Sequence, residues 1–134
     1  MLSLIESKRG KKRMRDSSHI SFYLRSTTIH IHRSTIRSLG NPPFVRFLIS
    51  KDEKTLLVQA YPKKDFQSFR VPKPLNDEIG RVQIHSKGFC QLIQRRLGWD
   101  ETCSYRIPGK PYLGQGVAAF DLEKAVRIKL YDET

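Results

Sequence analysis

One pattern of residues occurs twice in this chain and constrains its fold more than any other feature. The two copies run through residues 27–40 and 80–99. Each opens with a short run that alternates polar and apolar side chains, Thr28–His32 in the first copy and Arg81–His85 in the second, which is the period of a half-buried strand. Each continues as a helix-length segment that ends at Leu-Gly, because glycine readily terminates a helix. The pattern predicts two copies of a unit that begins with a strand and a helix.

Further runs rich in strand-forming residues surround the two copies. They are residues 19–25, 44–50, 55–61, 66–71, 102–107, 116–122 and 125–130. The polar residues 51–54 are typical of a hairpin turn, and residues 108–111, which contain Pro-Gly, predict a second turn. We therefore expect an α+β fold, a mostly antiparallel sheet or small barrel of eight or nine short strands with two helices, built from two strand–helix–strand–strand pseudo-repeats.

The helix predicted in the second copy carries one apolar stripe. The side chains that recur at helical period, and that we expect to be buried, are Phe89, Leu92, Ile93 and Leu97. The side chains expected to face solvent are Gln91, Gln94 and Arg95. Ser34 and Ser86 precede or open the two helices, where a hydroxyl can accept a backbone hydrogen bond, so both are predicted N-caps.

The length of 134 residues favours a single domain. We expect residues 19–134 to form it, with pseudo-repeats of about 19–72 and 79–131. Residues 1–18 are a basic leader without sustained periodicity, which predicts disorder. Met14 offers an alternative translation start just before the first strand.

The cysteines and the apolar runs exclude several other classes of protein. Cys90 and Cys103 lack the paired spacing of a zinc site or a disulfide framework, so both are predicted to be small core residues. No apolar run approaches the ~18 residues of a membrane span, and the apolar start of the chain is shorter than a signal-peptide core. The sequence therefore predicts a cytoplasmic protein that does not bind membranes.

The chain has a formal net charge of +12, which attracts phosphate polymers. Nineteen basic and eleven acidic residues follow position 16, so the excess belongs to the body as well as to the leader. The leader cations are Lys8, Arg9, Lys11, Lys12, Arg13 and Arg15. The cations expected at or near the strand–helix junctions are Arg33, Arg37, Arg81, Lys87, Arg95 and Arg96. Together they form the candidate nucleic-acid-binding set.

A strand that ends in a polar residue, a short helix that closes on Leu-Gly and a following hairpin resemble the AbrB/MazE/MraZ group of swapped-hairpin regulators. The matching stretches are residues 28–60 and 81–122, and residues 80–84 (Gly-Arg-Val-Gln-Ile) are similar to the opening motif of that group. His85 stands where the group has proline, and the first copy lacks the Gly-Arg pair. The resemblance implies two copies that pair into one DNA-binding barrel.

The carboxylates do not suggest an active site. Asp52-Glu53, Asp77-Glu78 and Asp100-Glu101 are adjacent acids in predicted turns, whereas general acid–base catalysis needs carboxylates that converge in a cleft. The chain also lacks a glycine-rich phosphate loop before a helix and a nucleophile elbow. We therefore predict a protein that is not an enzyme and that uses no cofactor.

Three histidines allow a metal site as an alternative. His30 and His32 lie two positions apart, so they leave the same face of their strand, and His85 matches His32 in the second copy. Paired copies could bring these three imidazoles to one point, where they would suit zinc or nickel. We instead predict that each strand simply ends in a polar residue whose ring caps backbone groups, without a metal.

The leading prediction is a non-enzymatic nucleic-acid-binding protein, a transcriptional regulator that binds duplex DNA as a monomer or homodimer. Both copies lie in one chain, so a monomer could complete the barrel. The alternative is a protein-interaction module, or an antitoxin-like partner, whose basic face meets an acidic protein. A steep salt dependence of binding favours the first prediction, and an exposed apolar patch favours the second.

Overall fold

The computed structural model describes residues 18–72 and 80–128, so the leader cations lie outside the described residues. Its elements in chain order are β2 (His19–Tyr23), β3 (Thr28–His32), α2 (Arg33–Ser38), β4 (Phe44–Ile49), β5 (Thr55–Tyr61), β6 (Phe69–Arg70), β7 (Arg81–His85), α3 (Lys87–Leu97), β8 (Ser104–Tyr112), β9 (Val117–Asp121), the 3-10 helix η1 (Leu122–Lys124) and β10 (Val126–Ile128).

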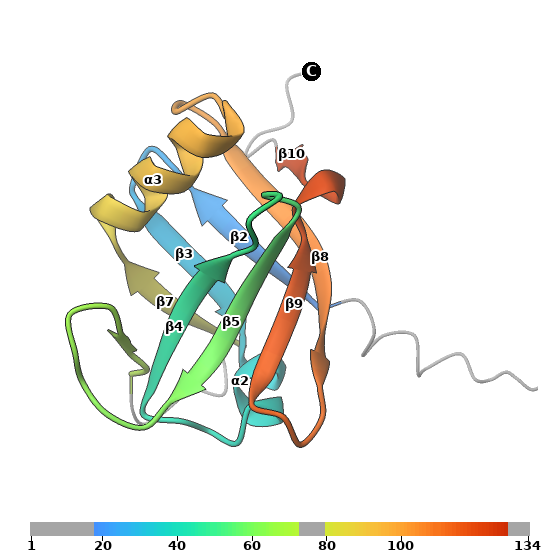
Figure 1. Cartoon of the computed structure of the whole chain (residues 1–134). Helices are drawn as coiled ribbons and strands as arrows, with labels where there is room; N and C mark the ends of the chain where they lie inside the picture. The colour runs from blue at the N-terminus through green and yellow to red at the C-terminus, as the bar shows by residue number, and fades with distance from the viewer. Residues whose placement is uncertain (1–17, 73–79, 129–134) are drawn as a thin grey trace, which may run out of the picture.

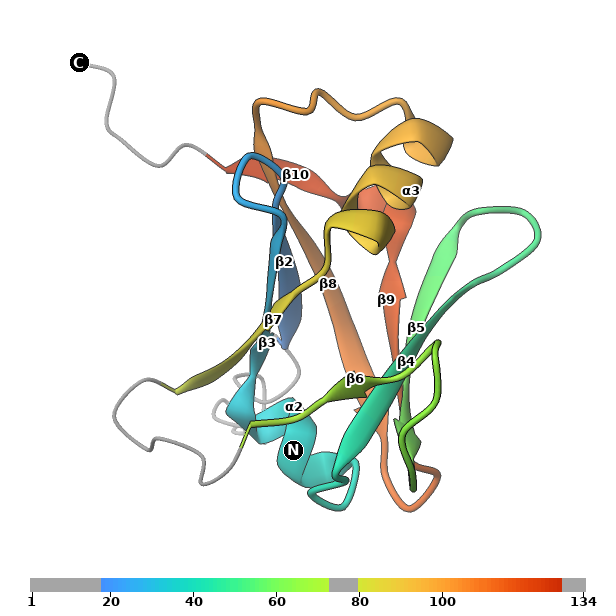
Figure 2. The same ribbon diagram turned by 90° about the vertical axis from the view of Figure 1, so that its left-hand side faces the viewer.

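The strands form one antiparallel sheet that curls into a nearly closed barrel (Figures 1 and 2). Hydrogen-bonded neighbours follow the order β6-β4-β5-β9-β8-β2-β3-β7, and β10 pairs with β8 beside this path. Because β6 and β7 stand at the two ends of this order, the ring is open between them. α2 lies at one end of the barrel and α3 at the other (Figure 1). The predicted fold class is confirmed.

The two predicted units recur as β3-α2-β4-β5 and β7-α3-β8-β9. β3 pairs with β7 in a register that is symmetric about His30 and Gln83, and β5 pairs with β9. Each unit also has a leading strand, β2 or β6, and the predicted pseudo-repeat of about 19–72 contained both. Each leading strand pairs with the other unit, β2 with β8 and β6 with β4. The units are therefore interlocked, not stacked side by side.

The alternation of side chains along the strands fills the barrel with one core. Its largest fully buried side chains include Ile20, Phe22, Ile29, Ile31, Ile36, Val45, Leu56, Val58, Ile93, Ile107 and Phe120. Both units contribute to this cluster, so neither unit has a core of its own. Burial of this apolar surface is the main force that holds the ring together.

The buried face of α3 differs from the predicted stripe. Cys90 and Ile93 are fully buried and Phe89 and Leu97 are half-buried, whereas Leu92 is 39% exposed. The prediction that Leu92 is buried is wrong because the helix contacts the barrel along positions 90, 93 and 97. Position 92 lies about 100° around the helix from position 93. Four apolar residues at helical spacing do not decide which side of the helix faces the core.

The two ends of α3 are fixed by hydrogen bonds. The predicted cap at Ser86 is confirmed, since its Oγ accepts a hydrogen bond from the backbone N–H of Phe89 at 3.1 Å. Gly98 adopts the left-handed conformation (φ 68°) that ends many helices. Gln94, predicted to be exposed, is half-buried because its Nε2 donates to the carbonyl oxygen of Trp99 at 2.7 Å.

The start of α2 departs from the sequence prediction. The helix begins at Arg33, and the capping residue His32 makes no side-chain cap bond, so the predicted cap at Ser34 and the predicted capping role of the His32 ring are both wrong. The backbone N–H of Arg33 instead donates to the carbonyl oxygen of Gly80 at 3.1 Å. This hydrogen bond to Gly80, the residue just before β7, thus takes the place of a side-chain cap. In the described parts of the chain, no helix is long and apolar enough to cross a membrane.

The turn predicted for residues 108–111 is wrong, because these residues belong to the long strand β8. The first half of β8 pairs with β2 and the second half with β9, so the strand turns a corner of the barrel. A Cβ atom at Gly109 would overlap the carbonyl oxygen of Ala119 and lie 2.7 Å from Phe120 Cα. Glycine is required at this corner because another strand approaches its backbone closely.

Candidate functional site

Four neighbouring strands form the part of the barrel wall that carries the candidate site. We call β8, β2, β3 and β7 (residues 104–112, 19–23, 28–32 and 81–85) the basic wall. Alternation sends every second side chain of these strands into the core and directs the others outward. The register places Arg106 opposite Ser21, and Ser21 opposite His30. Polar side chains therefore line up across the outer face of the wall.

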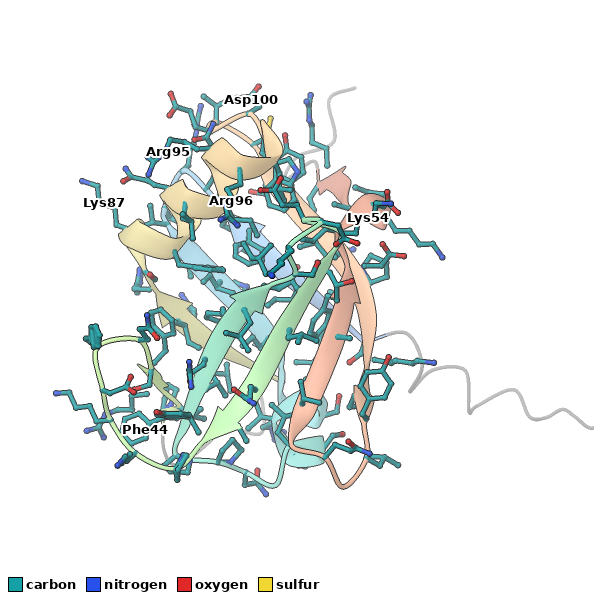
Figure 3. The ribbon with its side chains drawn as sticks, viewed as in Figure 1. Phe44, Lys54, Lys87, Arg95, Arg96 and Asp100 are labelled. Atoms are coloured by element: carbon teal, nitrogen blue, oxygen red, sulfur yellow. The ribbon has the colours of Figure 1, made fainter. Side chains whose placement is uncertain are left out.

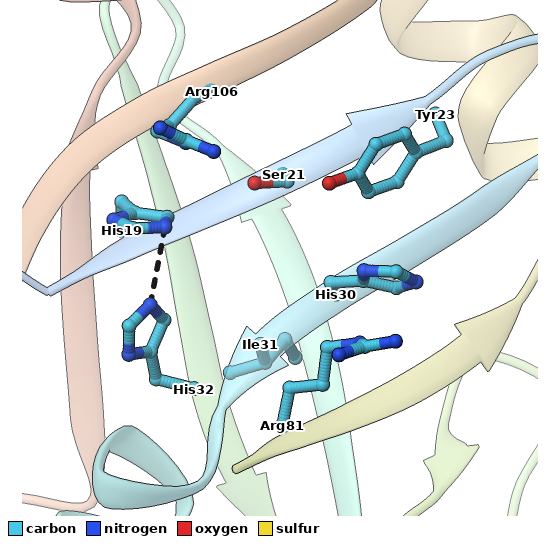
Figure 4. Close-up of a pocket in the computed structure, with 8 residues that line it drawn as sticks. All are labelled: His19, Ser21, Tyr23, His30, Ile31, His32, Arg81 and Arg106. Atoms are coloured by element: carbon cyan, nitrogen blue, oxygen red, sulfur yellow. Dashed lines mark hydrogen bonds between the residues drawn. The ribbon is translucent and has the colours of Figure 1, made fainter. Parts of the chain in front are cut away.

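A cavity of about 330 Å³ opens on this outer face (Figure 4), and we call it the polar cavity. Its lining residues are His19, Ser21, Tyr23, His30, Ile31, His32, Arg81 and Arg106. Ser21 is only 3% exposed, which places it at the floor. Figure 4 shows Arg106 and Arg81 on opposite sides, with Ser21 and the histidines between them.

Two histidines are joined across β2 and β3. The Nε2 atoms of His19 and His32 lie 3.1 Å apart, and the rings meet edge to face with centroids 4.3 Å apart. One Nε2 must donate and the other accept, so only one of the two carries a proton while the bond exists. On the other side of the cavity, the ring of Tyr23 packs against that of His30 at 4.5 Å.

The polar cavity holds two imidazoles in their neutral form at neutral pH. Partial burial, and to a lesser degree the Arg81 guanidinium, lower the pKa of His30 below its ordinary value of 6.5. Partial burial and then the Arg106 guanidinium lower the pKa of His32 in the same way. Burial, the larger cause, disfavours a charge of either sign, and only the smaller contribution of the two guanidinium groups reflects a positive potential in the cavity.

The four strands of the basic wall and the two helices α2 and α3 contain no described carboxylate. Their cations are Arg33, Arg37, Arg81, Lys87, Arg95, Arg96, Arg106 and Lys110. The described acids lie elsewhere, in connections, on β9 or on η1, and they are Asp52, Glu53, Asp65, Asp100, Glu101, Asp121 and Glu123. The described acids are therefore segregated from these elements and share the rest of the described surface with nine further cations.

The structure divides the predicted junction cations between the two ends of the barrel. Because β3 and β7 are antiparallel, Arg81 pairs with His32 and lies at the α2 end, near the exposed Arg37. Arg33 is 8% exposed, so little of it can reach a ligand. At the opposite end, Figure 3 shows the predicted cations of α3 along that helix. They are Lys87, Arg95 and Arg96. Arg96 forms a salt bridge, since its Nε lies 3.5 Å from Oε2 of Glu53.

The three histidines of the predicted alternative site do not converge. His85 is exposed at the far end of β7, where its Nδ1 lies 3.4 Å from the hydroxyl of Thr28. Within residues 18–72 and 80–128, no group of three or more His, Cys, Asp or Glu side chains is placed to hold a metal ion. Cys90 is buried as predicted, and burial raises the pKa of its thiol to about 11, which keeps it uncharged.

Sequence reasoning missed four of the seven polar residues that line the polar cavity. The missed residues are His19, Ser21, Tyr23 and Arg106. The alternation of His19, Ser21 and Tyr23 with apolar residues indicates that they share one face of a strand. The sequence does not reveal that β2 lies between β3 and β8, and this pairing brings the four residues together.

Comparison with known proteins adds no relative: no protein-family model, no curated protein and no solved structure matches this chain.

Proposed function

We propose that this protein binds nucleic acid, with duplex DNA as its partner, and that it does so as a regulator without catalysing a reaction. The observation that carries the proposal is the segregation of charge. The basic wall and both helices hold eight described cations and no described carboxylate. Cations on elements that carry no described carboxylate attract the phosphate backbone toward the wall.

The cations of this surface divide into two roles in the proposed complex. Arg81, at the α2 end of the wall, and Arg106 both line the polar cavity, and in the proposed complex they hold a phosphate there. Arg37 at one end and the α3 cations at the other are far enough apart to contact different phosphates or a base edge. Phosphate contacts position a protein on the duplex, and base contacts specify the sequence.

The test is a fluorescence-anisotropy titration of one mixed-sequence and one AT-rich duplex at several salt concentrations. The full chain is compared with a chain that lacks residues 1–13, which removes five leader cations. We expect the deletion to weaken binding to both duplexes equally and to flatten the salt slope by about 0.9 for each phosphate that the shorter chain no longer neutralises. Replacing Arg37 and Arg81 by Gln in the shorter chain should remove most remaining binding and any preference between the duplexes.

A matched control is Arg70→Gln, because Arg70 is exposed on β6, outside the basic wall. It removes one positive charge and should leave most of the affinity intact. Full-length protein that binds neither duplex at ~50 mM salt, where electrostatic binding is strong, would contradict the proposal.

That result would favour the alternative, a protein-interaction module. Its support in the structure is the exposure of two large apolar side chains in loops, Phe66 at 92% and Leu113 at 77%. Apolar surface of this kind marks contact sites for other proteins when it is contiguous.

A further inference from the structure

We propose that the polar cavity is a binding site for a phosphate group and that the cavity takes up protons when the phosphate binds. The inference deepens the proposed function and rests on it for the source of the phosphate, which is the backbone of a nucleic acid. A backbone phosphodiester carries one negative charge on two terminal oxygens, and a free phosphate monoester carries one or two on three. Both sources thus present anionic phosphate oxygens, and they are separated by experiment below.

The lining of the cavity supplies the donors that such a group needs. Arg81 and Arg106 approach from β7 and β8, the two outer strands of the basic wall, and flank the cavity (Figure 4). A guanidinium can donate two parallel hydrogen bonds to phosphate oxygens. Ser21 at the floor and Tyr23 at the rim add hydroxyl donors. The volume of about 330 Å³ falls within the range of small-ligand pockets, roughly 300–1,000 Å³.

The charges around the cavity favour an anion over a metal ion. Two guanidinium groups face it, and none of its described lining residues is a carboxylate. After burial, these guanidinium groups are the second cause of the lowered pKa values of His30 and His32. Their charge would repel a metal cation and attract an anion.

The paired imidazoles link anion binding to proton uptake. While the His19–His32 hydrogen bond exists, one Nε2 carries no proton. When a second proton binds, both Nε2–H groups are donors, the hydrogen bond between the rings breaks, and an anion can accept a hydrogen bond from each ring. The charged and polar groups that face His30 and His32 are Arg81 and Gln83 from β7, Arg106 from β8, and His19, Ser21 and Tyr23 from β2. The anion opposes the effect of both arginines, so it raises the pKa of the rings.

The first experiment follows the histidine ring resonances of the full-length protein by NMR from pH 5 to pH 8. Sulfate is the probe because it keeps its charge over this range, and chloride at equal ionic strength is the control. We expect sulfate, but not chloride, to raise the pKa of His30 and His32. Each ring whose pKa rises by one pH unit should bring about tenfold tighter sulfate binding to its protonated form.

Two variants show whether sulfate binds in the polar cavity or is attracted to the basic protein in general. In Arg81→Gln/Arg106→Gln, sulfate should no longer change either pKa, whereas in the matched control Arg70→Gln it should act as in the parent. Removing the two arginines also raises both pKa values without sulfate, so the readout is the change that sulfate produces. Equal responses in both variants would overturn the proposal.

The second experiment replaces sulfate with a 5′-mononucleotide or with the mixed-sequence duplex. If the duplex raises the pKa of His30 and His32 and Arg81→Gln/Arg106→Gln loses this response, the phosphate is that of a nucleic acid. If the mononucleotide acts and the duplex does not bind, the cavity site stands and the proposed function fails. If the duplex binds without any effect on the two rings, the proposed function stands and the cavity site fails. If sulfate, mononucleotide and duplex all leave both rings unchanged, the cavity proposal is wrong.

Discussion

Ile93 carries the contact between α3 and the barrel, whereas its neighbour Leu92 lies at the surface. Ile93 has no exposed area and packs within the core cluster, and Leu92 remains 39% exposed. We expect Ile93→Ala to lower the free energy of unfolding by about 2–5 kcal/mol, because it leaves a cavity that the rigid barrel cannot close. Leu92→Ala should cost less than about 1 kcal/mol. Urea denaturation of both variants measures the difference, and equal costs would contradict the packing described here.

The lowered pKa values of His30 and His32 predict how stability depends on pH. The unfolded chain binds more protons than the folded protein between the folded pKa values and 6.5, so acidification favours unfolding. The stabilisation is complete above pH 6.5 and is lost as the pH falls through the folded values. We expect a lower free energy of unfolding at pH 5 than at pH 7.5 in a chloride buffer, and a flatter profile for His30→Gln/His32→Gln.

Two further observations separate this effect from other titrations. Hydrogen bonds lower the pKa of Asp52, Asp65 and Asp100 below 3.8, so these carboxylates lose their contribution only at lower pH. Sulfate should reduce the loss between pH 7.5 and pH 5 in the parent protein, because it favours the protonated rings. A double variant that keeps the parent profile would show that other groups cause the pH dependence.

At the scale of single residues, the sequence predicted the types of side chain at the site but not their partners. The spacing of His30 and His32 correctly placed both rings on one face of a strand. Their partners, His19 and Arg106, lie 11 or more positions away in sequence and arrive through strand pairing. Local patterns contain no information on which strands become neighbours, so these contacts had to come from the structure.

Strand β8 is the element on which the shape of the barrel depends. It leaves β2 and joins β9 at Gly109, where no side chain fits against Ala119 and Phe120. We expect Gly109→Ala to destabilise the protein by about 1–3 kcal/mol, because the backbone of β8 or β9 must shift. Gly88→Ala is the matched control, since a Cβ atom there has no neighbour within 4 Å.

Alanine is also a better helix former than glycine, so Gly88→Ala in α3 should stabilise by about 0.5–1 kcal/mol. Thermal unfolding of the two variants should therefore show shifts of opposite sign. A Gly109→Ala protein as stable as the parent would mean that the corner of β8 is looser than the structure shows.

The same strand explains the limits of prediction at the level of elements. Hydrophobic alternation, turn residues and helix stops located the strands and both helices, because these signals are local. Pro108 and Pro111 also signalled a turn, yet both lie within β8. A proline lacks the N–H that a strand donates, but a strand that changes partners at a corner tolerates this loss. The strand rather than a turn at these prolines is recognised only from the pairing of β8, first with β2 and then with β9.

The whole molecule is a single folding unit made from two interlocked halves. Pairings β2–β8, β3–β7, β4–β6 and β5–β9 all join one half to the other. We expect residues 1–64 and 65–134, a division that leaves β6 with the second half, to lack stable structure when produced separately, because each half alone exposes its share of the common core. Mixing the two at equal concentration should restore the β-sheet signal in circular dichroism. A fragment that folds cooperatively by itself would show that the halves are independent.

Two identical chains that built this ring would carry the same residue at positions 30 and 83, because these positions face each other at the centre of the β3–β7 register. Every substitution in such an assembly would occur twice, once in each half. In the single chain His30 faces Gln83, and the leading strands differ in length, with five residues in β2 and two in β6. Joining the halves in one polypeptide thus frees each from the other's substitutions. The basic wall, which takes two strands from each half, can therefore carry a charged cavity that the other four strands of the ring, β6, β4, β5 and β9, do not have to repeat.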